Sequence, residues 1–380
     1  MSQAPVLFNT LPTASGHVFG RATLNAPASL NALSLAMVDL LQPQLATWAA
    51  DPQVAGVVLD AAGDKAFCAG GDIVELAQEI RQLHQSQPGA VPAHAEEFFE
   101  REYRLDYGIH TFPKPFLVWG HGIVMGGGIG LMAGASHRVV TPKTRLAMPE
   151  IGIGLFPDVG GSWFLSRMPG RTGAFLALTG APLNAADALF GGLADFALRP
   201  EDHALLLNGI SASHWQGQGA RAANDAQLAH IIHRLAGDAR ISLPASPLRT
   251  HLDRINAVID HDQLSDMAPR LAVLQSDADP WLAQAGAAFA KGSPTSAALA
   301  LALQQRCKRA SLAESFRLEY QAAVGCCAHE DFAEGVRALL IDKDKTPRWQ
   351  PATLAEMPAD WIDDHLRPRF DGSHPLADLA

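Results

Sequence analysis

Two glycine-rich segments constrain the fold of this chain most strongly, because each would join an apolar segment to a helix through residues without side chains. The first is Lys65–Ile73, with the sequence KAFCAGGDI, and the second is Met125–Gly130, with the sequence MGGGIG. Glycine leaves the backbone N–H groups of such turns uncovered. If the fold brings the turns together, the N–H groups of Gly71 and Gly127 could donate to one carbonyl oxygen, as in an oxyanion hole.

Composition and charge limit the classes of protein to consider. The chain has 380 residues, of which 48% are hydrophobic and 18% charged, as expected for one large domain plus a smaller one. A net charge of -10 argues against non-specific binding of nucleic acid. The N-terminal 20 residues lack the pattern of an export signal. The glycines and histidines between 115 and 137 favour a buried segment over a membrane span, so we expect a cytoplasmic protein.

Strand-like and helix-like segments alternate through the first half of the chain. The expected elements are strands at 17–24, 54–59, 116–119 and 139–140, and helices at 33–48, 95–110 and 126–135. This alternation predicts an α/β fold. After about residue 175 the pattern becomes helical, so we predict a domain of residues 1–200 and a helical region of residues 201–380 that packs over it.

The second glycine segment permits two other interpretations. Gly128, Gly130 and Ala133 fit the dinucleotide-binding pattern GxGxxA, with Glu150 twenty residues further on. In that pattern the acid ends a central strand, which Pro149 disfavours here. The interpretation as a helix whose glycines are purely structural remains open. The oxyanion-donor interpretation is favoured because a second turn of the same kind exists.

Three acids are candidates for the chemistry of the site. Glu150 and Asp158 lie in an apolar loop whose glycines and Pro157 exclude a continuous helix, and a carboxyl group in such surroundings can exchange protons near neutral pH. The alternative for Asp158 is an N-cap of the helix that follows. Glu102 has no basic residue four positions later, so it is free to face a pocket, although a solvated surface position is the alternative. The four cysteines and the histidines show no metal-ligand spacing, and we expect no metal.

These motifs resemble the crotonase (enoyl-CoA hydratase/isomerase) superfamily, and within it the 3-hydroxyisobutyryl-CoA hydrolase branch. The resemblance rests on Lys65–Ile73, on Gly122–Leu131 and on Met148–Ser162, and it continues through Asp331–Ala338. It covers nearly the whole chain and is weakest from about 200 to 290. One departure is Ala26, which stands where the family usually has arginine.

The resemblance implies a spiral of ββα turns with a helical C-terminal region, and it assigns roles to single residues. Gly71 and Gly127 would bind the carbonyl oxygen of an acyl-CoA thioester, Glu150 and Asp158 would be the catalytic acids, and Glu102 would contact the substrate. The hydratases of the superfamily use a second glutamate where this chain has a glycine, so hydration with two glutamates is not available in its usual form. Coenzyme A is then part of the substrate, and no separate cofactor is expected.

The leading hypothesis is hydrolysis of a short 3-hydroxyacyl-CoA, with 3-hydroxyisobutyryl-CoA of valine breakdown as the expected substrate. A crotonase-type isomerase or hydratase is the first alternative, and a non-catalytic structural relative is the second. The superfamily favours trimers and hexamers, and the oligomeric state is open here, because the C-terminal extension could replace the contacts of such a homo-oligomer. No nucleic-acid or membrane partner is expected.

Overall fold

Two compact units make up the chain, each assembled from segments that are far apart in the sequence. The computed structural model describes residues 4–239 and 241–380. Unit 1 consists of Met1–Gly71, Leu105–Leu146 and Leu183–Ser246, and unit 2 of Asp72–Arg104, Ala147–Pro182 and Pro247–Ala380. These units do not coincide with a single boundary near residue 200, and the domains 1–200 and 201–380 stay a prediction.

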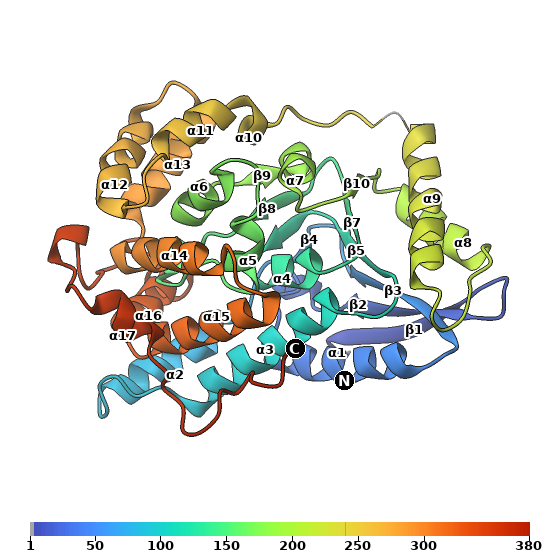
Figure 1. Cartoon of the computed structure of the whole chain (residues 1–380), viewed down its shortest axis with the longest axis horizontal. Helices are drawn as coiled ribbons and strands as arrows, with labels where there is room; N and C mark the ends of the chain where they lie inside the picture. Colours follow the sequence, from blue (N-terminus) through green and yellow to red (C-terminus); the bar gives the residue numbers. More distant parts are fainter. Residues whose placement is uncertain (1–3, 240) are drawn as a thin grey trace. The chain divides into compact units, whose positions relative to one another are not determined.

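The strands form two β-sheets, and Figure 1 labels all of these strands except β6. The six-stranded sheet has the order β1-β2-β3-β5-β7-β10, and the four-stranded sheet has the order β4-β6-β8-β9. The strands are β1 (Val6–Pro12), β2 (Val18–Leu24), β3 (Val54–Ala61), β4 (Ala66–Cys68), β5 (Phe116–Gly120), β6 (Ile123–Met125), β7 (His137–Val140), β8 (Arg145–Ala147), β9 (Leu183–Asn184) and β10 (Phe196–Ala197).

The chain repeats a strand–strand–helix order as it passes between the sheets. β3, β5 and β7 lie in the six-stranded sheet, and the strands that follow them, β4, β6 and β8, lie in the four-stranded sheet. A helical segment comes after each pair: α2 (Val74–His84), α4 (Gly127–Ala133) and the 3₁₀ helix η2 (Glu150–Ile153). The predicted spiral of ββα turns is therefore confirmed.

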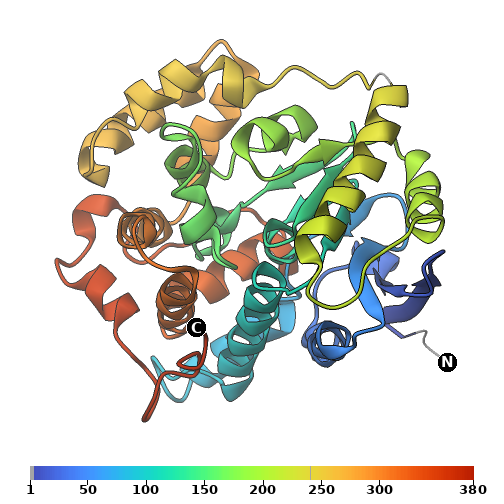
Figure 2. The ribbon, with the colours of Figure 1, turned by 45° about the vertical axis from the view of Figure 1, so that its right-hand side comes forward.

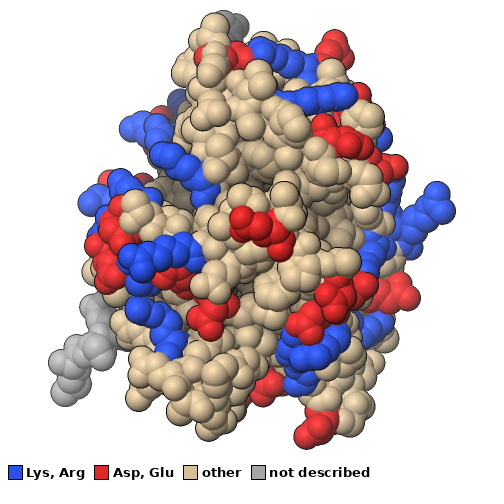
Figure 3. Space-filling model, turned by 90° about the vertical axis from the view of Figure 1, so that its left-hand side faces the viewer, with Lys and Arg blue, Asp and Glu red and all other residues tan. Residues whose placement is uncertain are grey.

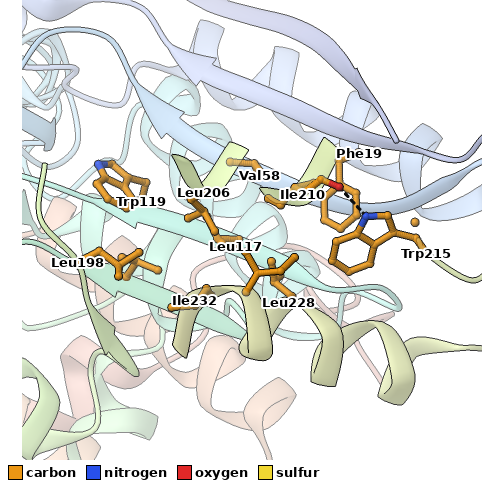
Figure 4. Close-up of a cluster of buried hydrophobic side chains, with 13 residues drawn as sticks. Phe19, Val58, Leu117, Trp119, Leu198, Leu206, Ile210, Trp215, Leu228 and Ile232 are labelled. Carbon is orange, nitrogen blue, oxygen red and sulfur yellow. Dashed lines mark hydrogen bonds between the residues drawn. The ribbon is translucent and has the colours of Figure 1, made fainter. Parts of the chain in front are cut away.

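The remaining helices of unit 1 cover its six-stranded sheet. They are α1 (Leu35–Ala50), α7 (Ala185–Gly191), α8 (Asp202–Ser211) and α9 (Arg221–Ala239). Ser34 caps α1 by accepting a hydrogen bond from the Met37 N–H, as expected for a helix start. Figure 4 shows side chains of α8 and α9 meeting those of the sheet. Between the two helices, the Trp215 ring lies 4.5 Å from the Phe19 ring of β2, measured between centroids. Burial of these apolar groups holds the two helices on the sheet.

Unit 2 is helical, and no strand follows Ala197 in the described part of the chain, so the predicted helical C-terminal region is confirmed. α3 (Ala93–His110) begins in unit 2 and ends in unit 1. Besides α2, the other helices of unit 2 are α5 (Gly161–Leu165), α6 (Thr172–Thr179), α10 (Pro247–Thr250), α11 (Leu252–Val258), α12 (Leu264–Val273), α13 (Pro280–Lys291), α14 (Pro294–Cys307), α15 (Leu312–Cys327), α16 (Glu330–Val336) and α17 (Trp361–Leu366). α14 and α15, in orange, pack side by side in Figures 1 and 2.

Candidate active site

The two glycine turns follow neighbouring strands of the four-stranded sheet. β4 and β6 are parallel and paired, with Cys68 beside Val124. Gly70 follows β4 with a φ of 108°, and Gly126 follows β6 with a φ of 47°, a backbone region that glycine adopts without steric cost. Because the carboxyl ends of parallel strands meet at one edge of a sheet, the turns lie side by side, which is the condition that an oxyanion hole between them requires.

A close backbone contact between β4 and α4 requires glycine at position 128. A Cβ atom at Gly128 would lie 2.4 Å from the Cys68 carbonyl oxygen, a distance that no side chain tolerates. A Cβ atom at Gly70 would lie 3.5 Å from the Met125 carbonyl oxygen, an ordinary van der Waals distance, so the φ of 108° rather than lack of space favours glycine there. The contact supports a structural, packing role for Gly128. This role does not exclude a ligand-binding role for the adjacent Gly127.

The two N–H groups assigned to the oxyanion hole, those of Gly71 and Gly127, lie in these turns. Gly127 is the first residue of α4, where N–H groups have no acceptor within the helix, and no side chain caps this helix. In the first turn, the Gly70 carbonyl accepts a hydrogen bond from the Leu33 N–H at 2.8 Å. This hydrogen bond does not involve the Gly71 N–H. Both donors can serve a ligand, and their role in an oxyanion hole stays a prediction.

Glu150 is a buried acid with an unused hydrogen-bond acceptor. It opens η2 in unit 2 and has 5% of its surface exposed. Its Oε2 atom is buried and has no hydrogen-bond partner among the described residues. Burial raises the pKa of Glu150 well above its ordinary value, and the neighbouring Asp158 and Glu102 raise it further. Such a group is suited to exchange a proton with a bound molecule.

Asp158 is held by a phenol. The Tyr103 hydroxyl donates a hydrogen bond to Oδ2 of Asp158 at 2.8 Å, and both side chains are buried. Burial raises the pKa of Asp158 to about 6, while the hydrogen bond from Tyr103 acts to lower it. The alternative of an N-cap is wrong, because Gly160 is the residue that precedes α5.

Glu102 lies on the buried face of α3, so the alternative of a solvated surface acid is wrong. It follows Phe98 by one helical turn, and both are nearly inaccessible to solvent. Burial raises the pKa of Glu102 well above its ordinary value, and the charge of Asp158 adds to this effect. The structure therefore brings the three predicted acids Glu102, Glu150 and Asp158 together in unit 2, and their catalytic and binding roles stay predictions.

Sequence reasoning missed Tyr103 as the partner of Asp158, and it missed Glu319 altogether. Glu319 has no exposed surface and accepts hydrogen bonds from the N–H groups of Gly160 and Ser162, each at 2.7 Å. A signal was present: Glu319 stands between Phe316 and Ala323, at the spacing of the apolar face of α15. An acid on such a face is buried, and a buried acid needs partners.

One group of side chains in the described part of the chain has the types and spacing of metal ligands. It consists of His329, Asp364 and His365, and their ligand atoms lie within 4.8 Å of one another. The Asp364 carboxylate already accepts hydrogen bonds from His329 at 2.8 Å and from Arg369 at 2.7 Å. The positive charge of Arg369 disfavours a cation at this place.

No helix within residues 4–239 and 241–380 is both long and apolar enough to cross a lipid bilayer. On the face shown in Figure 3, Lys and Arg side chains are interspersed with Asp and Glu rather than gathered into a patch of one sign. This face does not offer the basic stripe that a nucleic-acid backbone requires.

Comparisons with known proteins match the chain over nearly its full length. Residues 19–366 match the family model described as enoyl-CoA hydratase/isomerase. The chain is 36% identical over 350 residues to the protein named 3-hydroxyisobutyryl-CoA hydrolase, mitochondrial, of Gallus gallus, and 35% identical over 349 residues to its namesake of Homo sapiens. In both cases the match covers 92% of this chain and 86% of the relative.

Two solved structures are similar to this chain in fold and in sequence. A carnitinyl-CoA dehydratase from Mycobacterium thermoresistibile superposes with a TM-score of 0.82 at 33% identity, covering 99% of this chain and 100% of that one. An enoyl-CoA hydratase from Rhodobacter sphaeroides gives a TM-score of 0.77 at 35% identity, covering 96% and 98%.

Proposed function

The chain belongs to the enoyl-CoA hydratase/isomerase family, and from that premise we propose that it hydrolyses the thioester of a short 3-hydroxyacyl-CoA, with 3-hydroxyisobutyryl-CoA as its expected substrate. The curated relatives in chicken and human both have the name 3-hydroxyisobutyryl-CoA hydrolase. The structural observation that carries the proposal is Glu150, a buried acid whose Oε2 atom has no partner among the described residues.

In the proposed reaction, the N–H groups of Gly71 and Gly127 bind the thioester carbonyl oxygen and stabilise the negative charge that develops there. Glu150 acts at the carbonyl carbon in one of two ways. As a nucleophile, its carboxylate forms a mixed anhydride, the carbon–sulfur bond breaks, and water then cleaves the anhydride. As a base, it takes a proton from the water that attacks. In both cases the thiolate of coenzyme A leaves and takes up a proton.

Asp158 and Glu102 are assigned to the substrate. Asp158 would accept a hydrogen bond from the 3-hydroxyl group and help to deliver protons, for which a pKa of about 6 is suitable. Glu102 would contact the acyl group beside it. Coenzyme A enters as part of the substrate and leaves as a product, so the proposed reaction needs no separate cofactor. With 3-hydroxyisobutyryl-CoA of valine breakdown as the substrate, the products would be 3-hydroxyisobutyrate and free coenzyme A.

A steady-state assay with a thiol reagent tests the proposal. Release of free coenzyme A from 3-hydroxyisobutyryl-CoA, faster than from the matched acyl-CoA without the hydroxyl group, is the expected result. Migration or hydration of a double bond in an enoyl-CoA without thiol release would favour an isomerase or hydratase. No turnover of either substrate would favour a non-catalytic relative.

Location and assembly are further proposals. The relatives have names that include the word mitochondrial, whereas the sequence patterns of this chain predict a cytoplasmic protein. Cell fractionation decides between the two places. A homotrimer or hexamer is tested by light scattering of the purified protein.

A further inference from the structure

Glu319 connects α15 to the loop that carries Asp158. Its Oε2 atom accepts a hydrogen bond from the Gly160 N–H and its Oε1 atom one from the Ser162 N–H, both at 2.7 Å. Neither α5 nor the residue before it supplies a side-chain cap of its own. Glu319 therefore supplies, from a helix 157–159 residues further along the chain, the acceptors that the first turn of α5 lacks.

The loop that Glu319 holds is strained next to Asp158. Val159 has a φ of 52°, in the left-handed region, and Gly160 has a φ of 86°. For a β-branched residue such as valine this conformation is a steric outlier. Residues in such conformations persist only when the surrounding structure supports them, and they concentrate at functional sites. The two hydrogen bonds to Glu319 begin at the residue directly after Val159.

α15 also contacts the partner of Asp158. The Phe316 ring, one helical turn before Glu319, lies 5.8 Å from the Tyr103 ring between centroids. The Tyr103 hydroxyl donates to Asp158 at 2.8 Å. One face of α15 thus supports both ends of this hydrogen bond, the phenol through Phe316 and the aspartate loop through Glu319.

We propose that Glu319 is a positioning residue, which holds the Val159–Ser162 turn in its strained conformation and thereby aims the Asp158 carboxyl at the substrate. This inference rests on the proposed function, in which Asp158 binds the 3-hydroxyl group. Glu319 itself is not a catalytic residue, because both of its oxygens already accept backbone hydrogen bonds.

The test compares Glu319→Gln with Glu314→Gln. Glutamine keeps the shape of the side chain, but its amide group faces an N–H donor instead of accepting from it. We expect kcat/KM for the 3-hydroxyacyl thioester to fall about tenfold to a hundredfold, and that for the plain acyl thioester to fall much less, so that discrimination is lost. Glu314 lies on the same helix and also accepts a backbone N–H, from Ser311 at 2.7 Å, but it is exposed, so Glu314→Gln should keep the discrimination.

Hydrogen–deuterium exchange gives a readout that does not need activity. Amides of residues 158–164 should exchange faster in Glu319→Gln than in the unmodified protein or in Glu314→Gln. An unchanged exchange rate in Glu319→Gln would overturn the proposal, and this outcome does not depend on which thioester the protein hydrolyses. A different outcome is faster exchange in Glu319→Gln while the unmodified protein hydrolyses neither thioester. That outcome would confirm that Glu319 supports the turn, and it would overturn the proposed function instead.

Val159→Gly tests whether strain is what Glu319 offsets. Glycine adopts a positive φ without cost, so Val159→Gly/Glu319→Gln should recover most of the discrimination that Glu319→Gln loses. If Glu319→Gln alone does not fold, recovery of folding in the double variant supports the proposal. A double variant with no recovery of either property would show that Glu319 acts by another route and would overturn the proposal.

Discussion

Four buried acids of unit 2 lie at or next to the candidate site, and their hydrogen-bond partners differ more than their burial does. None of Glu102, Glu150, Asp158 and Glu319 exposes more than 5% of its surface. Glu319 accepts two backbone N–H groups, Asp158 accepts a phenol, and Oε2 of Glu150 has no partner in the described part of the chain. An acid with satisfied oxygens has a structural role, whereas an acid with an unused oxygen can act on a ligand. Glu150 is therefore the strongest candidate for the chemistry.

Replacing Glu150 by glutamine should remove hydrolysis and keep binding. The amide has the same shape but is neither a base nor a nucleophile, so we expect kcat to fall at least about a hundredfold. Acyl-CoA binding, measured by calorimetry, should change little. Glu356→Gln, the same change at an exposed position, is the control. Normal turnover by Glu150→Gln would show that the proposed mechanism is wrong.

Replacing Tyr103 by phenylalanine should raise the pKa of Asp158. The hydroxyl group donates to the carboxylate and so favours its ionised form, and without it the cost of burial acts alone. Carboxyl ¹³C NMR should show Asp158 titrating above the value of about 6 that the intact pair gives. Tyr107→Phe makes the same change one turn further along α3 and should leave this titration unchanged. An unshifted Asp158 in Tyr103→Phe would contradict the assignment.

Between elements, backbone contact decides where the two glycine turns lie. β4 and α4 approach so closely at Cys68 and Gly128 that a methyl group has no room between them. The N–H of Gly127 belongs to the same turn of α4, so its position depends on this contact. The packing of one strand against one helix therefore controls the donor that the proposed oxyanion hole requires.

Gly128→Ala should damage both stability and activity. The new Cβ would stand 2.4 Å from the Cys68 carbonyl oxygen, so α4 must move away from β4, at a cost of about 1–3 kcal/mol in the free energy of unfolding. The displaced Gly127 N–H should lower kcat more than it changes KM. Thermal denaturation and steady-state kinetics measure the two effects.

Gly108→Ala provides the matched control for this change. Gly108 lies inside α3, is exposed, and a Cβ there meets nothing within 4 Å. Alanine at that position should stabilise the helix slightly, by about 0.5–1 kcal/mol, with unchanged kinetics. Equal effects of the two substitutions would contradict the role of the contact between β4 and α4.

For the whole molecule, buried acids and buried histidines make stability depend on pH in opposite directions. Burial raises the pKa of Glu319 to about 8 and that of Asp158 and Asp331 to about 6. A group whose pKa is raised by folding contributes stability that is fully present below its unfolded pKa and is lost as pH rises through its folded pKa. Burial lowers the pKa of His110 and His365 to about 4, so their contribution is lost as pH falls from 6.5 towards 4.

Above pH 6.5 the histidines no longer oppose the acids, so stability should fall as pH rises from 6.5 to about 8. Each acid that stays protonated only in the folded state contributes a slope of about 1.4 kcal/mol per pH unit. Urea unfolding at several pH values measures the slope. Glu319→Gln removes one such group and should flatten the curve, and a stability that rises over this range would contradict the burial of these acids in the folded state.

Much of the architecture could be predicted from local patterns. The strands expected at 54–59 and 116–119 and the helix at 33–48 are present within two residues of the predicted ends. They follow from hydrophobic periodicity and capping, which depend on residues close in sequence. The compact units could not be predicted in this way, because each collects segments that are separated by other parts of the chain.

Local sequence was enough to identify the glycine turns and the acids Glu102, Glu150 and Asp158, because a turn's backbone and a side chain's chemistry are local properties. The tertiary structure alone decided that Glu102 is buried, that Tyr103 binds an aspartate 55 residues away, and that Glu319 holds the turn that follows it. The physical reason is that desolvation and hydrogen-bond pairing depend on which distant segments pack together, and no local pattern specifies that.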